Sequence, residues 1–186
     1  MELGKTAYVI LGMLSQGARS GYDIKAKADV STRFFWAISY GQIYPELKRL
    51  ERAGLIAGEA EPTGGRRRNS YSLTPAGEQA LHDWLAGDGE IHFELRHEGI
   101  LRFFFADALD RDEQVELLRR IRAEHERVLG ELERIQPVAE RLAGEGGGIA
   151  PLLTLETGIA YQEFFIDLCD RLERRVSDLQ SPSGGT

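Results

Sequence analysis

The sequence has few of the features that secreted, membrane-spanning or disulfide-linked proteins need. Cys169 is the one cysteine among 186 residues, so an internal disulfide is impossible, which is compatible with a reducing cytoplasm. The apolar run from Ala7 to Leu14 is far too short to cross a bilayer. A single lysine precedes this run and no small-residue cleavage site follows it, so we expect no signal peptide. These absences predict a cytoplasmic protein without a membrane partner.

Motifs for catalysis, metal binding and phosphate binding are also missing. His97-Glu98 and His125-Glu126 each begin like a zinc-protease motif, but neither has a second histidine four residues after the first. No cysteine pair is available for zinc, no glycine-rich loop follows a predicted strand, and Ser15 lacks the flanking glycines of a nucleophile elbow. We therefore predict that the protein is not an enzyme and has no catalytic residues, metal site or cofactor.

The most informative stretch that is present is SYGQIYPELKRLERAGL, residues 39–55. At about 100° per residue it forms a helix with one apolar side, made of Ile43, Leu47 and Leu50. The opposite side carries small, amide and cationic groups, namely Gly41, Gln42, Pro45, Arg49 and Arg52, with Lys48 on the flank. One face can therefore pack on a core while the other meets something outside the protein.

Both ends of this helix are marked in the sequence. Ser39 predicts its N-cap and Gly54 its C-terminal stop. Pro45 predicts a kink or an irregular first turn, because proline removes a backbone hydrogen bond and crowds the carbonyl four residues earlier. Taken alone, the stretch also fits an ordinary amphipathic helix with a solvated basic face.

The neighbouring segments favour a more specific interpretation. Helices are predicted over Thr6–Ser15 and Gly21–Val30, and strands over Ile56–Glu61 and Ser70–Leu73. Three helices followed by a hairpin form a winged helix, whose third helix enters the major groove of DNA. Arg66–Arg68 lie at the glycine-rich hairpin tip, where guanidinium groups suit phosphate or minor-groove contacts. The alternative for these arginines is a solubilising charged turn that protects a sheet edge.

These segments resemble the PadR-type transcriptional regulators. The motif residues are Gly21-Tyr22-Asp23-Ile24, Ser39 through Ile56, and Gly65 through Thr74, and the resemblance is close over residues 1 to 85. Tyr44-Pro45 inside the recognition helix is the most specific element. Asn69 departs from the family, whose wing often carries a further basic residue there. The resemblance implies an N-terminal winged helix, a C-terminal helical dimerisation domain, and repressors that in some cases release DNA on binding phenolic acids or planar drugs.

The net charge of −7 is unexpected for a DNA-binding protein until it is divided between the two halves. Residues 1–85 contain 11 basic and 9 acidic groups, a balance of +2, whereas residues 86–186 contain 12 basic and 21 acidic groups, a balance of −9. Screening limits charge effects to about 8–10 Å at ordinary salt, so the placement of the basic groups matters more than the total.

Beyond the hairpin the pattern is entirely helical. A helix capped by Thr74 should run to Ala86, and Gly87–Gly89 should end the first domain. Further helices are predicted over residues 93–108, where Phe103–Phe105 suggest burial on more than one side, and over 111–136 and 151–179. Pro137 should kink or restart the chain, and residues 144–148 should form a loop between the arms of a helical hairpin. The predicted fold is mainly α with a small β-hairpin: a winged helix-turn-helix domain at 1–86, a helical dimerisation domain at 90–179, and a disordered tail at 180–186.

Long amphipathic helices need partners for their apolar stripes. Ile121, His125, Val128, Leu132 and Ile135 form a short heptad seam. His125 is either a pH-sensitive dimer position or a solvated or hydrogen-bonded seam histidine. The candidate dimerisation residues of the last helix are Tyr161, Phe165, Leu168, Leu172, Val176 and Leu179. A two-fold dimer would read two half-sites of a palindromic operator. The alternative is a monomer in which the helical hairpin folds on the winged-helix domain of its own chain.

The functional prediction is a sequence-specific, double-stranded DNA-binding transcriptional regulator that acts as a homodimeric repressor, with a winged-helix protein-interaction adaptor as the alternative. The predicted DNA-binding residues are Ser39, Tyr40, Gln42, Tyr44, Lys48, Arg49, Arg66, Arg67 and Arg68. Residues of a possible pocket for a small aromatic effector are Trp84, Phe93, Phe104, Tyr161 and Phe165, although aromatic stripes at helical spacing also fit plain core. Cys169 is most simply a small buried hydrophobe.

Overall fold

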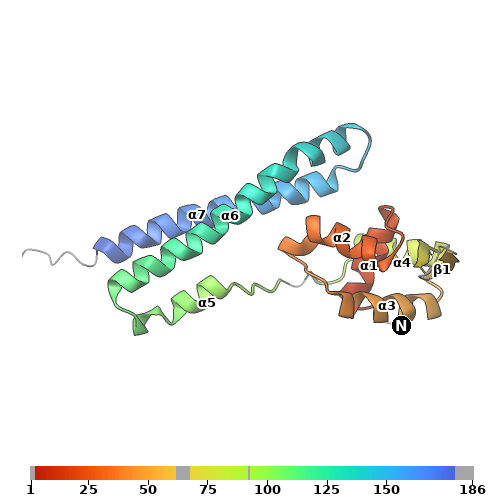
Figure 1. The fold of residues 1–186 in the computed structure, drawn as a ribbon, viewed down its shortest axis with the longest axis horizontal. Coiled ribbons are helices and arrows are strands. Elements are labelled where there is room, and N and C mark those ends of the chain that lie inside the picture. Colours follow the sequence, from red (N-terminus) through yellow and green to blue (C-terminus); the bar gives the residue numbers. More distant parts are fainter. Residues whose placement is uncertain (1–2, 62–67, 92, 179–186) are drawn as a thin grey trace, which may run out of the picture. The chain divides into compact units, whose positions relative to one another are not determined.

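The computed structural model describes residues 3–61, 68–91 and 93–178, with the side chains of residues 60, 61 and 68 left out. The chain divides into two compact units, Met1–His92 and Phe93–Thr186, which we call the head and the arm. Figure 1 shows the elements of each unit, mainly helical with one two-stranded antiparallel hairpin. The predicted fold class is confirmed, and none of the described helices is long and apolar enough to span a membrane.

The described residues of the head form four α-helices, a short 3₁₀ turn and the hairpin. In chain order these are α1 (Lys5–Ser15), α2 (Gly21–Val30), η1 (Thr32–Phe34), α3 (Tyr40–Arg52), β1 (Ile56–Glu61), β2 (Arg68–Leu73) and α4 (Pro75–Ala86). The prediction for α2 is confirmed at both ends, and Ser20 caps it by accepting a hydrogen bond from the Asp23 amide. Thr74 caps α4 in the same way, accepting from the Gly77 amide with Pro75 in the first turn.

The apolar side of α3 closes the core of the head. Ile43, Leu47 and Leu50 have no exposed surface, as their spacing predicts. They pack in one cluster with α1 and α2, where Ile10, Leu11 and Ile24 are also fully buried. Burying such a side chain stabilises a fold by about 1.5–3 kcal/mol, so this cluster fixes α3 against the other helices.

The hairpin is fastened to the helices at its base. Ile56 pairs with Leu73 and Glu61 with Arg68 at the two ends of the described ladder. The Tyr71 amide donates to the Arg19 carbonyl at 2.7 Å, and the Thr74 hydroxyl donates to the Gly54 carbonyl at 2.7 Å. The first bond ties β2 to the turn before α2, and the second holds the root of the wing beside the end of α3.

The arm is a helical hairpin preceded by a short helix. Its elements are α5 (Glu98–Phe104), η2 (Ala106–Ala108), α6 (Arg111–Gly144) and α7 (Ala150–Asp178). Figure 1 shows α6 and α7 lying side by side along most of their length, with a turn between them. The loop predicted over residues 144–148 is therefore observed, and the seam residues of α6 pair within the chain.

Two predictions for the arm were wrong, and one of two alternatives in a third is excluded. The helix expected over residues 93–108 is only α5, which begins after His97 caps it by accepting from the Ile100 amide at 3.1 Å. The triplet Phe103–Phe105 is not buried on several sides, since Phe104 is 77 % exposed and Phe105 is 64 % exposed. Pro137 was predicted to kink or restart the chain, and the restart is excluded because α6 continues through it to Gly144. Pairing with α7 stabilises α6 despite one missing hydrogen bond, since helices in proteins depend mainly on tertiary packing.

Candidate nucleic-acid interface

The first turn of α3 is organised by Ser39 and Gln42. Ser39 has extended backbone geometry, with φ −107° and ψ 160°, as an N-cap requires. Its amide donates to the Gln42 Oε1 atom at 2.9 Å, and its hydroxyl lies 3.1 Å from the same oxygen. This is the glutamine half of a capping box, in which the third helical residue reaches back to the cap. Both residues are exposed, so the predicted interface begins with a turn of fixed geometry.

Pro45 lies inside α3 without ending it. The helix is continuous from Tyr40 to Arg52, although Pro45 has no amide to donate to the Gly41 carbonyl. That carbonyl belongs to the exposed first turn. Proline therefore leaves the helix intact and leaves a backbone acceptor on the outer side of its first turn.

Two tyrosines stand on the outer side of α3. Tyr40 is 42 % exposed and Tyr44 is 49 % exposed, and their rings stack with centroids 6.0 Å apart. Tyr44 also lies against α2, where a Cβ atom added to Gly21 would come within 2.8 Å of its Cε1 atom. The position of the Tyr44 ring thus depends on a glycine in the neighbouring helix.

Arg49 is not a free cation. Its Nε atom donates to Glu46 Oε2 at 2.9 Å and its Nη2 atom to Glu46 Oε1 at 2.6 Å, a bidentate fork of the strong kind. The side chain of Arg49 is 36 % exposed and that of Glu46 is 17 % exposed. The hydrogen bonds to Glu46 raise the pKa of Arg49 above its usual value. Lys48, in contrast, is an exposed residue on the flank of the same helix.

The wing arginines are only partly within the described part of the chain. Arg66 and Arg67 lie outside the described residues. Arg68 opens β2, and its backbone is paired with that of Glu61.

The aromatic residues predicted to form an effector pocket are found in different surroundings. Within the head, Trp84 stacks on Tyr8 with centroids 4.5 Å apart. Within the arm, Phe93 and Phe104 are highly exposed, and Phe104 borders an open hollow of about 580 Å³ that also includes Leu95, His97 and Leu101. The arm brings Tyr161 and Phe165 together, with ring centroids 4.8 Å apart.

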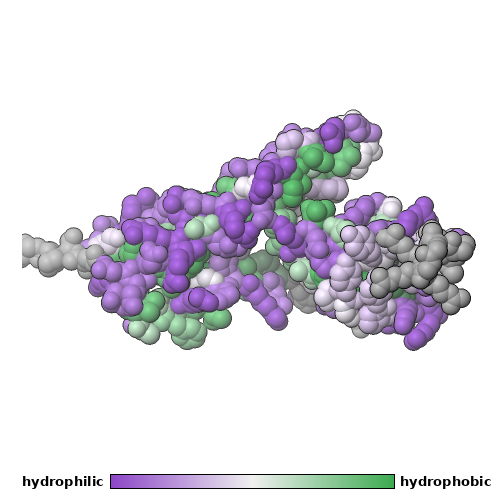
Figure 2. Space-filling model, in the orientation of Figure 1, coloured by the Kyte–Doolittle hydropathy of each residue, from purple (hydrophilic) through white to green (hydrophobic). Residues whose placement is uncertain are grey.

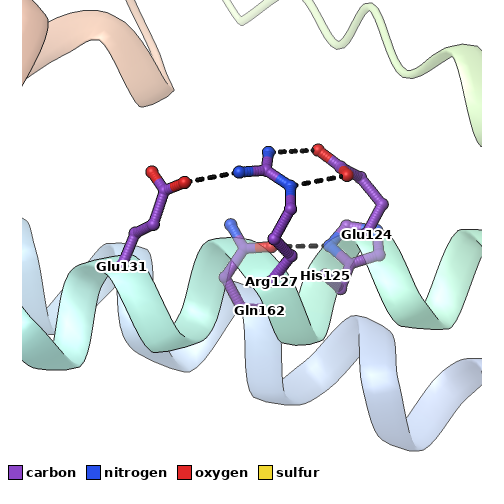
Figure 3. A network of polar contacts seen from close by, with 5 residues as sticks. All are labelled: Glu124, His125, Arg127, Glu131 and Gln162. Carbon is purple, nitrogen blue, oxygen red and sulfur yellow. Dashed lines mark hydrogen bonds and ion pairs between the residues drawn. The ribbon is translucent and has the colours of Figure 1, made fainter.

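A chain of hydrogen bonds joins the three helices of the arm. His97 Nε2 lies 2.8 Å from His125 Nε2, and His125 Nδ1 lies 2.6 Å from Gln162 Oε1; Figure 3 shows the second of these contacts. Since His97 Nδ1 accepts from the Ile100 amide, its proton is on Nε2, His125 accepts at Nε2, and His125 donates from Nδ1 to Gln162. Both histidines are therefore neutral in this arrangement. His125 is the hydrogen-bonded seam histidine rather than an exposed one.

The candidate dimerisation residues of α7 differ in exposure. Phe165 is buried and stacks on His125 with centroids 4.7 Å apart, so its ring is packed within its own hairpin. Tyr161 is exposed. Leu168, Leu172 and Val176 are half-buried, and Leu179 lies outside the described residues.

The roles of four residues in these sites were missed from the sequence. Glu46 precedes Arg49 by three residues, a spacing at which helical side chains meet, and Gln42 completes the Ser-x-x-Gln signature of a capping box. Both signals were present. His97 and Gln162, by contrast, lie 28 and 37 residues from His125, and no local pattern links them.

A head with three packed helices, an exposed polar face on the third, and an adjacent two-stranded wing defines the winged-helix class of DNA-binding proteins. Family comparison gives the same result. The model of the transcriptional regulator PadR-like family matches residues 10–83, and that of the virulence activator alpha C-terminal region matches residues 95–177. The chain belongs to the PadR-like family of transcriptional regulators, which is not a family of enzymes.

Individual relatives support this assignment along most of the chain. The negative transcriptional regulator PadR of Bacillus subtilis is 30 % identical over 164 residues, covering 86 % of this chain and 90 % of that protein. The crystal structure of Bacillus subtilis PadR in complex with operator DNA is 26 % identical with a TM-score of 0.83, covering 95 % and 99 % of the two chains. The complex of the same regulator with p-coumaric acid is 27 % identical with a TM-score of 0.75, covering 92 % and 98 %.

Proposed function

We propose that this protein is a cytoplasmic, homodimeric repressor that binds a palindromic operator in double-stranded DNA through α3 and the wing. The observation that carries the proposal is the division of α3 into a fully buried apolar side and an outer side of amide, phenol and cationic groups. Bacillus subtilis PadR, with the same fold, has been crystallised with operator DNA. A helix held this firmly by its inner face presents its outer face in a fixed orientation, which base recognition needs.

Each predicted DNA-binding residue has a role that fits its position. Gln42, Tyr44, Lys48 and Arg49 approach the major groove and its rims. Ser39 and Tyr40, at the start of the helix, contact phosphates. Arg66, Arg67 and Arg68 contact the backbone or the minor groove. Phosphate contacts supply affinity for any sequence, and base contacts supply the preference for one sequence.

The homodimer forms through the arm. Figure 2 shows apolar side chains gathered on the surface of the arm, around α5 and at the end where α6 meets α7. The exposed apolar residues there include Leu101, Phe104, Leu142 and Leu153. Apolar area of this kind is typical of interaction surfaces. We assign the last helix to the interface through its predicted stripe of Tyr161, Phe165, Leu168, Leu172, Val176 and Leu179, with Phe165 acting through the packing of its own hairpin.

Relief of repression by a small aromatic ligand is the second part of the proposal. Bacillus subtilis PadR has been crystallised with p-coumaric acid. The aromatic side chains assigned here to ligand recognition are Trp84 in the head and, separately in the arm, Phe93, Phe104, Tyr161 and Phe165. Planar aromatic surfaces stack with one another favourably. Titration of the protein–DNA complex with p-coumaric acid tests this part directly, and release of DNA is the expected result.

The decisive experiment measures binding of the purified full-length protein to fragments of its source genome. We expect enrichment of a palindrome, a dimer by analytical ultracentrifugation, and an affinity that falls with salt by a log–log slope of about 0.9 per phosphate contact. Replacing Arg49 should relax base discrimination, whereas replacing Arg67 should weaken binding to all sequences alike. If the wild type ignores duplex DNA at low salt, the adaptor alternative replaces this proposal.

A further inference from the structure

The capping box fixes which end of the Gln42 amide faces outward. The Ser39 amide can only donate, so the Gln42 atom 2.9 Å from it must be the carbonyl oxygen Oε1. The amino group Nε2 consequently points away from the cap. If the amide were turned over, two donors would face each other and the cap would be lost. Gln42 is exposed, so its outward chemistry is that of a hydrogen-bond donor.

Arg49 lies on the same stripe of α3. Gln42, Glu46 and Arg49 are spaced i, i+4 and i+7, which places them in a line along one side of the helix. The Glu46 carboxylate engages both Nε and Nη2 of Arg49 and is itself mostly covered, with 17 % of its side chain exposed. A planar guanidinium that is held at two atoms has few orientations left. Glu46 therefore restricts the direction in which Arg49 reaches.

We propose that Gln42 reads the operator as a hydrogen-bond donor only and that Glu46 is the positioning residue for Arg49, so that this stripe selects base edges rich in acceptors, above all guanine. The inference rests on the proposed function and specifies the chemistry of its target.

The major-groove edges of the bases make this proposal specific. Guanine presents two acceptors, N7 and O6, whereas cytosine presents an amino donor. Adenine presents one acceptor and one donor, and the usual bidentate contact of glutamine with adenine needs both ends of the amide. With Oε1 committed to Ser39, Gln42 cannot make that contact. A guanidinium likewise has donors and no acceptor, so both side chains favour the same kind of base edge.

The test is a selection of bound duplexes from a randomised library, with the full-length protein and matched variants. Gln42→Glu retains the capping box, because glutamate serves at this position as well as glutamine, but it replaces the outward donor by an acceptor. Glu46→Gln removes the charge that holds Arg49. Glu51→Gln is the control, since it makes the same charge change about 180° around the helix from Gln42. Far-ultraviolet circular dichroism checks that each variant keeps its helices.

For Gln42→Glu we expect the preferred base at one pair in each half-site to change to cytosine or adenine, with a change in discrimination of about tenfold. An unchanged profile would overturn the donor-only assignment. A second result would also overturn it. If the wild type prefers adenine at that pair and loses this preference when the base is purine, which lacks the amino group, then Gln42 accepts a hydrogen bond from adenine.

For Glu46→Gln we expect weaker discrimination at a second pair, while Glu51→Gln changes only overall affinity. In an Arg49→Lys background, Glu46→Gln should cause no further change in base preference, because lysine cannot form the fork. An equal change of base preference in the wild-type and Arg49→Lys backgrounds would overturn the positioning role, because Glu46 would then be reading a base itself. Failure of the wild type to bind any duplex would instead reject the proposed function.

Discussion

The head and the arm combine polar and apolar groups differently. The head buries an apolar core and turns the charged side of α3 outward, whereas the arm buries His125 and Gln162 in its seam and exposes Leu101 and Phe104. An apolar core is non-directional and gives stability, while hydrogen-bonded polar groups in a seam are directional and help to set alignment. The comparison teaches that the head has a core of its own and that the arm, under the proposed function, completes its burial in a second copy.

The largest loss of stability expected from this comparison comes from creating a cavity in the core of the head by substitution. Leu47→Ala removes a fully buried side chain and should lower the free energy of unfolding of the head by about 2–5 kcal/mol. Because the arm is a separate compact unit, the dimer should persist in sedimentation experiments while DNA affinity falls. Leu85→Ala, at an exposed leucine of α4 in the same unit, is the control. Loss of the dimer in Leu47→Ala would show that the two units depend on each other.

A smaller loss of unfolding free energy should follow when one partner of the buried His125–Gln162 hydrogen bond in the arm is replaced. Gln162→Leu leaves the buried Nδ1 donor of His125 without its acceptor, which costs about 1–3 kcal/mol. The double variant His125→Leu with Gln162→Leu should recover part of this loss in urea denaturation, because both members of the His125–Gln162 pair are then gone. The recovery is incomplete because His97 Nε2 loses its acceptor on His125. If the double variant is less stable than Gln162→Leu alone, the stacking of His125 on Phe165 contributes more than the hydrogen bond.

The hydrogen bonds of His97 to His125 and to the Ile100 amide also predict that the stability of the arm depends on pH. Desolvation, and secondly the proximity of His125, lower the pKa of His97 below 6.5. Unfolded His97 therefore binds its proton at a higher pH than folded His97, so its contribution to stability is full above pH 6.5, declines as the pH falls towards the folded pKa, and stays lost below it. Urea midpoints measured across this range should show the decline. His97→Asn, which keeps a capping oxygen, should flatten it, and His82→Gln, at an exposed histidine, should not.

The smallest effect should come from the outer face of α6. There Arg127 donates to both carboxylate oxygens of Glu124, at 2.6 and 2.9 Å, and also pairs with Glu131; Figure 3 shows this fork. Such exposed ion pairs contribute little and are screened by salt. Arg127→Gln should lower the melting temperature slightly at low salt and not at high salt. A loss comparable to that of Gln162→Leu would mean that this face is covered in the assembled protein.

The head could be predicted from its sequence because its signals are local. Caps at Ser20, Ser39 and Thr74 and the spacing of Ile43, Leu47 and Leu50 each act within a few residues, and α2 was predicted at both ends. The arm could not be predicted as fully. Its short helix α5 shows an apolar run whose side chains are exposed, and hydrophobicity alone does not reveal whether a partner covers them. The alternative that Pro137 restarts the chain failed, because pairing of α6 with α7, which keeps α6 continuous, is a long-range effect.

The candidate site shows the same limit at the level of single side chains. Which residues lie on the outer side of α3 followed from periodicity, but what those residues do to one another did not. Gln42 was assigned to DNA contact without its commitment to Ser39, and Arg49 without Glu46. Side-chain orientation is set by hydrogen bonds that depend on rotamers, and periodicity carries no information about rotamers.

Gly21 has a consequence for how such regulators diverge. A methyl group at this position would need the space that the Tyr44 ring occupies, so Gly21→Ala would displace the phenol without any substitution in α3. A screen for altered operator preference should therefore recover substitutions at Gly21 in α2, where the absence of a side chain gives the Tyr44 ring its space.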